Sequence, residues 1–410
     1  MINLLWAGML LCALAVAFYN LIFYQNTETF DLLVSALFKN AQTAVDISIG
    51  LIGILSFWLG ILKLIEESEI SQKISRFLSP LFRVIMKDIP KDSPAISTIV
   101  LNMAANFLGL DNAATPMGLK AMEQLQQHNK TKDTASDAEI LFMIINASSV
   151  TLIPMTIFMY RAQMGASHPT DVFIPILLAT SVSTIVGFIL VAIKQKINLF
   201  HPLLLKTFWG FLIFIFLVTL GFYKLDYEKR MAVSSALGNI ILLSLIGVIL
   251  VGALKKRVHC YETFVEGAKE GFNVAIRIIP YLLAMLVAIG AFRASGILDM
   301  IIDGIKSLCA MLGCDGGFAD AMPTAFMKPL SGSGARAMMI ETMQNFGADS
   351  FAAFASSVIQ GSTETTFYVL TVYFGAINVS KTRYALKYAL LSDLAGIVAA
   401  ILLSYLFYAR

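Results

Sequence analysis

The sequence predicts an all-α, polytopic membrane protein with about nine transmembrane helices and two re-entrant helical hairpins in two inverted-topology repeats. Of its 410 residues, 58% are hydrophobic and 14% are charged, and the mean hydropathy is +0.76. Soluble domains have about 45–50% apolar and about 25% charged residues, so a globular soluble protein is excluded. Long apolar runs recur along the chain, and two interrupted runs align with each other.

Apolar runs long enough to cross about 30 Å of hydrocarbon, at about 1.5 Å per helical residue, define the predicted spans. They cover residues 4–23, 44–65, 138–160, 172–193, 202–223, 232–254, 273–292, 351–374 and 385–408. The first run has no preceding Lys or Arg and no small-residue cleavage pattern, so we expect an uncleaved helix there. Segments 71–86 and 296–312 mix apolar and charged residues, which is typical of helices in the membrane interface.

Two further apolar regions, 96–122 and 318–343, are interrupted near their middles, at 109–112 and 329–334. Each half is too short to span the membrane, so each region predicts a re-entrant hairpin whose open backbone faces protein or water. At the first tip, we expect Asp111 and Asn112 to end one half-helix. Thr115 and Pro116 then suit the N-cap and first turn of the next.

The two halves of the chain also predict a duplication. Residues 145–151 align with 359–365, which places Asn146 opposite Gln360 and Ser148 opposite Ser362. Five full spans separate the starts of the two repeats, and an odd number inverts the second relative to the first. Loops rich in Lys and Arg at 130–132, 194–206, 255–257 and 381–383 fall on one side. By the positive-inside rule, the N-terminus is cytoplasmic in a bacterial inner membrane.

The helix breaks and the two polar helix centres predict a solute site near the bilayer midplane. Ser331 to Gly334 would offer backbone N–H groups at a helix N-terminus, which with Arg336 favours an anionic or electronegative group. Gln360, Thr363 and Glu364 are expected to share one helix face by their spacing. The candidate binding residues are Asp111, Asn112, Thr115, Asn146, Ser148, Ser149, Thr151, Ser331, Ser333, Gly334, Arg336, Gln360, Ser362, Thr363, Glu364 and Thr365.

Structural alternatives exist for these residues. The Ser-Gly-Ser-Gly stretch would also cap a tight turn, and the hydroxyls and amides would also join neighbouring helices. Asn102 and Asn106 would either line the same cavity or satisfy its backbone. Glu364 is a functional candidate because a carboxyl at mid-depth is costly, and it or Asp111 could carry a coupling ion, Na⁺ or H⁺.

Several functions are not expected. The four cysteines show no C-x-x-C spacing, and no span holds paired histidines or a hydrolase motif, so we expect neither a metal site, a cofactor, catalytic residues nor an enzyme. A net charge of +3 gives no reason to expect a nucleic-acid partner. The expected partners are a small-molecule solute and the lipid bilayer, and the sequence leaves a homo-oligomer open.

Several motifs resemble those of a known family. Residues 108–122, which read LGLDNAATPMGLKAM, resemble the motif of spore maturation protein A. Residues 329–336 and 360–368 look like spore maturation protein B. The whole chain therefore resembles a fusion of the two, with a nucleoside-recognition or gate domain in each half, distantly similar to concentrative nucleoside transporters.

With this resemblance, the chain divides into four predicted segments. Residues 1–43 would be an N-terminal transmembrane helix and an amphipathic linker, and 44–196 the repeat similar to protein A. Residues 197–270 would connect it to the repeat similar to protein B, 271–410. We expect a secondary transporter for a small polar or anionic solute, with a nucleoside-like solute as one candidate, that works by alternating access. The alternative is a non-transporting membrane scaffold or accessory protein in envelope or spore maturation.

Overall fold

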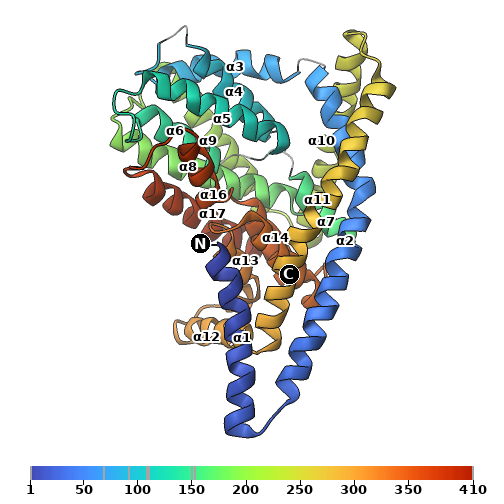
Figure 1. The fold of residues 1–410 in the computed structure, drawn as a ribbon. Coiled ribbons are helices and arrows are strands. Elements are labelled where there is room, and N and C mark those ends of the chain that lie inside the picture. The colour runs from blue at the N-terminus through green and yellow to red at the C-terminus, as the bar shows by residue number, and fades with distance from the viewer. Residues whose placement is uncertain are drawn as a thin grey trace. The chain divides into compact units, whose positions relative to one another are not determined.

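The computed structural model describes residues 2–67, 70–90, 93–107, 111–148, 151 and 154–408, and the regular elements in these ranges are helical (Figure 1). Seven helices in this part of the chain are long and apolar enough to cross a membrane. They are α1 (Ile2–Tyr24), α2 (Glu28–Glu67), α8 (Phe173–Lys194), α9 (Pro202–Tyr223), α10 (Tyr227–Lys255), α11 (Cys260–Ala294) and α17 (Ala385–Tyr408). The predicted all-α, polytopic fold class is confirmed.

The other two predicted spans are interrupted helices. One is divided into α6 (Asp137–Ala147) and α7 (Met155–Gln163), and the other into α15 (Phe351–Gly361) and α16 (Thr366–Ala376). Pro154 directly precedes α7 and Gly361 ends α15, and both residue types favour a helix boundary. The expectation that Gln360, Thr363 and Glu364 share one helix face was therefore wrong, because α15 ends before Thr363.

Of the two re-entrant regions, the second breaks where the sequence predicts, and the predicted break of the first includes 109–110, which lie outside the described residues. The first consists of α4 (Pro94–Phe107) and α5 (Asp111–His128), and the second of η1 (Gly317–Ala321), α13 (Met322–Met327) and α14 (Gly332–Phe346). The two arms of each hairpin pack against each other. The predicted helix start at the first tip was wrong: α5 begins at Asp111, so Pro116 lies inside it. An acidic residue in the first turn suits the positive end of the helix dipole.

Two short helices occupy the predicted interfacial segments. They are α3 (Ile70–Ile85), which packs on α4, and α12 (Ile297–Met311), which packs on η1. In α12, Leu298 and Ile302 are buried against Ala319. Each repeat thus has the same order of elements: a long helix, a short amphipathic helix, a hairpin, an interrupted helix and a final helix.

The chain divides into two compact units that each draw on both repeats. Unit 1 comprises Met1–Gly60, Ile157–Pro169 and Phe264–Gln360, and unit 2 comprises Ile61–Thr156, Thr170–Thr263 and Gly361–Arg410. Unit 1 therefore contains the second hairpin with α15, and unit 2 contains the first hairpin with α6 and α16. Each unit holds one half of each interrupted helix.

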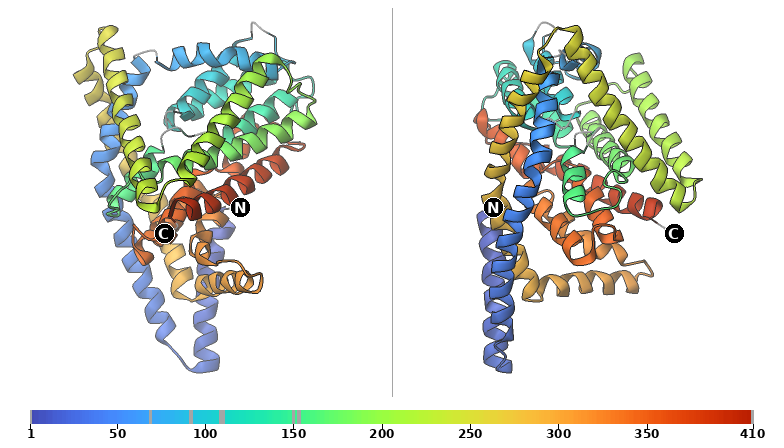
Figure 2. Two further views of the ribbon diagram at one scale, coloured as in Figure 1. Left: turned by 180° about the vertical axis from the view of Figure 1, so that it is seen from behind. Right: turned by 90° about the vertical axis from the view of Figure 1, so that its right-hand side faces the viewer.

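Unit 1 is organised around α2 and α11, the first helices of the two repeats. They run antiparallel, because Asn40 of α2 lies against Gly290 of α11 whereas Gly60 of α2 lies against Phe264. The absence of a Cβ at these glycines permits the close approach. Helix α1 folds back along α2, and Figure 2 shows this pair joined by a short turn.

Unit 2 is organised around α8 and α17, the last helices of the two repeats. Ser183 Oγ donates to the Ser392 carbonyl at 3.0 Å, and Ser392 Oγ donates to the Ser183 carbonyl at 2.7 Å. Gly187 lies against Ser392, and Gly396 lies against Ser183, so the helices are antiparallel (Figure 2). Small residues four apart on both helices permit such packing in membranes. In each unit, equivalent helices of the two repeats run antiparallel, as inverted repeats require.

Candidate functional site

The two interrupted helices meet at their breaks within unit 2. The Glu364 N–H, just before α16, donates to the Ala147 carbonyl, the last residue of α6, at 2.8 Å. This bond joins the first repeat to the second. Because helix ends carry unsatisfied backbone groups and partial charges of opposite sign, the end of α6 and the start of α16 attract each other.

Asn146, which adjoins Ala147 at this junction, belongs to a cluster of three amides and one phenol. We call it the asparagine network: Asn102, Asn106, Asn146 and Tyr373. Asn146 Nδ2 donates to Tyr373 Oη at 2.9 Å, and Asn106 Nδ2 donates to Asn146 Oδ1 at 2.5 Å. The Tyr373 ring stacks on Phe142, with centroids 5.6 Å apart. The sequence alone does not single out Tyr373, because a tyrosine in an apolar run looks like the lipid-facing aromatic residues.

Hydroxyl groups line the same region of unit 2. Ser148 Oγ donates to the Ile144 carbonyl at 2.8 Å, and Thr184 Oγ1 donates to the Ser148 carbonyl at 2.5 Å. The buried hydroxyls of Thr363 and Thr366 have no hydrogen-bond partner among the described residues. A buried polar group without a partner costs about 1–3 kcal/mol, so these hydroxyls are suited to bind water, an ion or a solute.

In unit 1, the tip of the second hairpin is partly capped from within. Ser331 is the N-cap of α14, and its Oγ accepts from the Gly334 N–H at 3.0 Å. Ser333 Oγ lies 3.2 Å from Ser331 Oγ, and Arg336 Nε donates to the Gly332 carbonyl at 3.2 Å. One of the N–H groups expected to face a solute is therefore used inside the helix, as the capping alternative predicts.

The second hairpin is joined to α15 by a buried bond between Thr324 Oγ1 and Ser356 Oγ, 2.6 Å long. One turn beyond Ser356 lies Gln360, 8% exposed, whose Oε1 has no partner in the described part of the chain. Lys328, at the end of α13, is 3% exposed. The sequence alone does not single out this buried cation, because a lysine beside Pro329 in a turn looks like an ordinary surface residue.

The remaining predicted site residues are distributed over both units. Ser362 and Thr365 are buried in unit 2, where Glu364 and Thr151 are partly exposed. Ser149 lies outside the described residues, and Asp111, Asn112 and Thr115 lie in α5 with side chains that the structure does not describe. Unit 2 thus brings together Asn146, Ser148 and the segment 362–365, whereas the predicted residues of 331–336 and Gln360 belong to unit 1.

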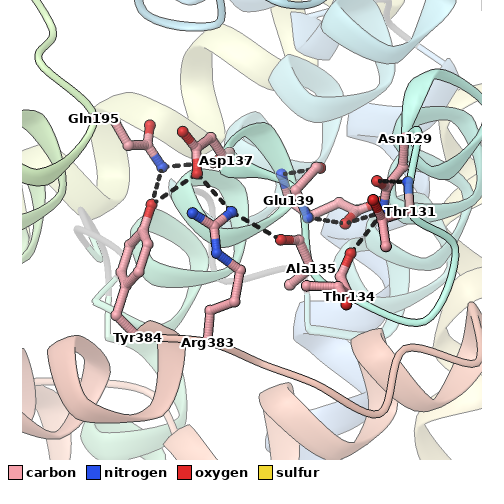
Figure 3. Close-up of polar contacts among 10 residues, drawn as sticks. Asn129, Thr131, Thr134, Ala135, Asp137, Glu139, Gln195, Arg383 and Tyr384 are labelled. Atoms are coloured by element: carbon pink, nitrogen blue, oxygen red, sulfur yellow. Dashed lines mark hydrogen bonds and ion pairs between the residues drawn. The ribbon is translucent and has the colours of Figure 1, made fainter.

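One end of unit 2 carries a polar cluster that links three loops, shown in Figure 3. Asp137 Oδ1 accepts from Arg383 Nη1 at 2.8 Å and from Tyr384 Oη at 3.0 Å. Gln195 Nε2, at the end of α8, donates to Tyr384 Oη at 2.9 Å. Burial raises the pKa of Tyr384 to about 12. These loops, before α6, after α8 and before α17, therefore lie together in unit 2.

A second part of this cluster fixes the start of α6 (Figure 3). The Ser136 N–H and Asn129 Nδ2 donate to Glu139 Oε2 at 2.7 and 3.3 Å, and Ser136 Oγ accepts from the Glu139 N–H. This is a capping box, in which the N-cap and the third helical residue satisfy each other. It holds one end of α6 in place, while Asn146 and Ala147 stand at the other end.

The model of the Gate family, described as nucleoside recognition, matches residues 48–167 and again residues 275–380. The two matches together cover more than half of the chain. The chain belongs to the Gate family. Each repeat of this Gate protein carries its own match, which confirms the predicted duplication, and every predicted site residue falls within one of the two matches.

Two relatives of this Gate protein come from Bacillus subtilis (strain 168). Spore maturation protein B is 49% identical over 157 residues, which are 38% of this chain and 86% of the relative. Spore maturation protein A is 39% identical over 190 residues, which are 46% of this chain and 93% of the relative. The predicted similarity to a fused A/B protein is confirmed. No solved structure matches this Gate protein.

Proposed function

We propose that this Gate protein is a secondary transporter that moves a small polar or anionic solute across a bacterial inner membrane by alternating access. The observation that carries the proposal is the junction of the interrupted helices, where the Glu364 N–H meets the Ala147 carbonyl. Interrupted membrane helices concentrate polar backbone at mid-depth, and secondary transporters use such ends to bind solutes and coupling ions.

Each unit by itself supplies groups around its helix breaks that suit a polar or anionic solute. Arg336 and the first turn of α14 suit an electronegative group. Asn146, Thr363 and Gln360 supply neutral hydrogen-bonding groups, and the last two include buried atoms without a partner in the described chain. Glu364 or Asp111 would carry the coupling ion, Na⁺ or H⁺. The family description, nucleoside recognition, makes nucleosides the first solutes to test.

The test is uptake into proteoliposomes containing the purified protein, with and without a Na⁺ or H⁺ gradient, across a broad panel of labelled solutes. Gradient-dependent uptake of at least one solute is expected, and uptake of none would contradict the proposal. Loss of the dependence of uptake on the coupling ion in Glu364→Gln would assign the ion to Glu364, and an unchanged dependence would remove Glu364 from the mechanism. Glu228→Gln, at an exposed position in the first turn of α10, is the matched control.

A second candidate function is a membrane scaffold or accessory protein without transport. The asparagine network favours it, because several of its polar groups satisfy one another in a packed interior. If the protein is a scaffold, substitutions in this network would lower its thermal stability, and neither the wild type nor the variants would transport a solute. Stable protein that shows no uptake of any solute, together with loss of envelope or spore integrity on deletion, would support this function.

A further inference from the structure

The asparagine network has a fixed direction of hydrogen bonding, and a backbone carbonyl sets it. Asn102 Nδ2 donates to the Ala114 carbonyl at 2.7 Å. A carbonyl oxygen can only accept, so this end of the Asn102 amide must be the NH₂ group. The opposite end of that side chain, Asn102 Oδ1, must then be an acceptor, and it faces Asn106 Nδ2 at 3.5 Å.

The orientation of the Asn102 amide fixes the orientations of the Asn106 and Asn146 amides in turn. Because Asn106 turns its NH₂ group toward Asn102, the same group donates to Asn146 Oδ1 at 2.5 Å. Asn146 therefore turns its own NH₂ group toward Tyr373 Oη, at 2.9 Å, and Asn102 Nδ2 lies 3.4 Å from the same oxygen. Both amide hydrogens of Asn102 and Asn106, and one of Asn146, are thus directed to protein oxygens inside the network.

The side-chain carbonyl oxygen of Asn106 is not used by the network. Its NH₂ group is engaged twice, whereas its Oδ1 receives no hydrogen bond from the part of the chain that the structure describes. Asn102 is fully buried, but Asn106 is partly exposed, at the last turn of α4 directly before the hairpin tip. Its partner Asn146 adjoins Ala147, the α6 residue at the junction of the interrupted helices.

We propose that Asn106 Oδ1 is the recognition group of the first hairpin and accepts a hydrogen bond from a hydroxyl or N–H group of a neutral, donor-bearing solute. This inference rests on the proposed transport function and narrows its solute class. The network cannot turn the Asn106 amide around to serve an anion, because the reversed amide would place an oxygen against the oxygens of Asn102 and Asn146. A site that accepts a hydrogen bond from a solute hydroxyl binds the deoxy analogue of that solute more weakly, because the analogue leaves the acceptor without a donor.

The experiment measures binding by isothermal titration calorimetry to the full-length protein in lipid nanodiscs. The probes are uridine, 2′-deoxyuridine, 3′-deoxyuridine, D-ribose, uridine 5′-monophosphate and inorganic phosphate. We expect a neutral probe to bind and one deoxy analogue to bind about three- to tenfold more weakly, as for the loss of one hydrogen bond. Removing the hydroxyl from the probe leaves the fold of the protein untouched.

The variant Asn106→Ala completes the comparison. The variant should bind the hydroxyl and deoxy probes equally. Thr98→Val, on the same helix, removes a hydroxyl that donates to the Pro94 carbonyl and should keep the wild-type preference. The inference is overturned if only the anions bind, if no probe binds, or if Asn106→Ala keeps the preference for the hydroxyl. If a gradient drives uptake of anions and of no neutral solute, the proposed transport function stands and this inference is wrong. If no solute is taken up, both are wrong.

Discussion

The hydroxyl of Tyr373 occupies the space into which a Cβ on Gly118 would project. The glycine belongs to the first hairpin. The tyrosine lies 255 residues further along the chain, in α16 of the second repeat. Tyr373 also stacks on Phe142 of α6 and accepts hydrogen bonds from Asn102 and Asn146. One side chain from the second repeat therefore holds together the hairpin and the interrupted helix of the first.

Gly118→Ala should displace Tyr373, since the new methyl group would overlap the phenol oxygen and adjacent ring carbon. We expect a loss of about 1–3 kcal/mol in the free energy of unfolding, as for other overpacked interiors, and a lower thermal unfolding midpoint in nanodiscs. The matched control is Gly221→Ala in α9, where no atom lies within 4 Å of the added Cβ. Equal midpoints for the two variants would show that Tyr373 is not held at Gly118.

Thr324 and Ser356 should behave as a coupled pair. Both side chains are fully buried, so Thr324→Val or Ser356→Ala alone leaves a buried hydroxyl without its partner and should cost about 1–3 kcal/mol. The double variant should lose less than the sum of the two single losses, by about 0.5 kcal/mol or more. Thermal unfolding of the four proteins measures this difference.

The control for that pair is Thr342→Val combined with Ser356→Ala. Thr342 is equally buried, but its hydroxyl bonds the Met338 carbonyl within its own helix. These two losses should add. Additive losses for Thr324 and Ser356 as well would mean that their contact does not join α13 to α15.

The pKa of Tyr384 predicts a change of stability at alkaline pH. Burial raises this pKa from its ordinary value of 10.0 to about 12, so folding favours the neutral phenol. The resulting stabilisation is fully present below pH 10 and is lost as the pH rises from 10 to about 12. Unfolding midpoints should therefore fall over this range in the wild type and fall less steeply in Tyr384→Phe. If the unfolding midpoints of the wild type and Tyr384→Phe fall in parallel, the loss of stability at alkaline pH does not come from Tyr384.

Native cysteines test the predicted orientation. The charge pattern places residue 260 on the cytoplasmic side and residue 314 on the opposite side. Cys314 is exposed and Cys260 is partly exposed, and neither forms a disulfide. A membrane-impermeant maleimide added to intact spheroplasts should label Cys314, and should label Cys260 only after permeabilisation. The variants Cys314→Ser and Cys260→Ser identify which cysteine gives each labelling signal. Labelling of Cys260 before permeabilisation and of Cys314 only after it would show that the predicted orientation is wrong.

Much of the fold is predictable from the sequence because a bilayer imposes strong local rules. Apolar runs of about 20 residues located α8, α9 and α17 to within a residue or two, since length and hydropathy suffice for a helix surrounded by lipid. The break of the second hairpin was predictable because glycine, serine and proline interrupt helices. The break after Ala147 was not predicted, because 138–160 remains apolar enough to look continuous.

The site was only partly predictable, for a different physical reason. Asn146, Ser148 and Thr363 stand out because polar groups are rare in a membrane span, and the aligned repeats make them recur at equivalent positions. Tyr373 and Lys328 do not stand out, because the burial of a tyrosine or a lysine depends on which helix packs beside it. The capping role of Ser331 likewise depends on where α14 begins.

By itself, the sequence determined that this chain is an all-helical membrane protein with duplicated, interrupted helices, because hydropathy, breaks and repeats are local properties of the chain. Only the tertiary structure decided which polar groups meet. It joined Glu364 to Ala147, fixed the direction of the asparagine network at the Ala114 carbonyl, and left Asn106 Oδ1 without a donor among the described residues. Hydrogen bonds between residues hundreds of positions apart depend on helix packing, which no local pattern specifies.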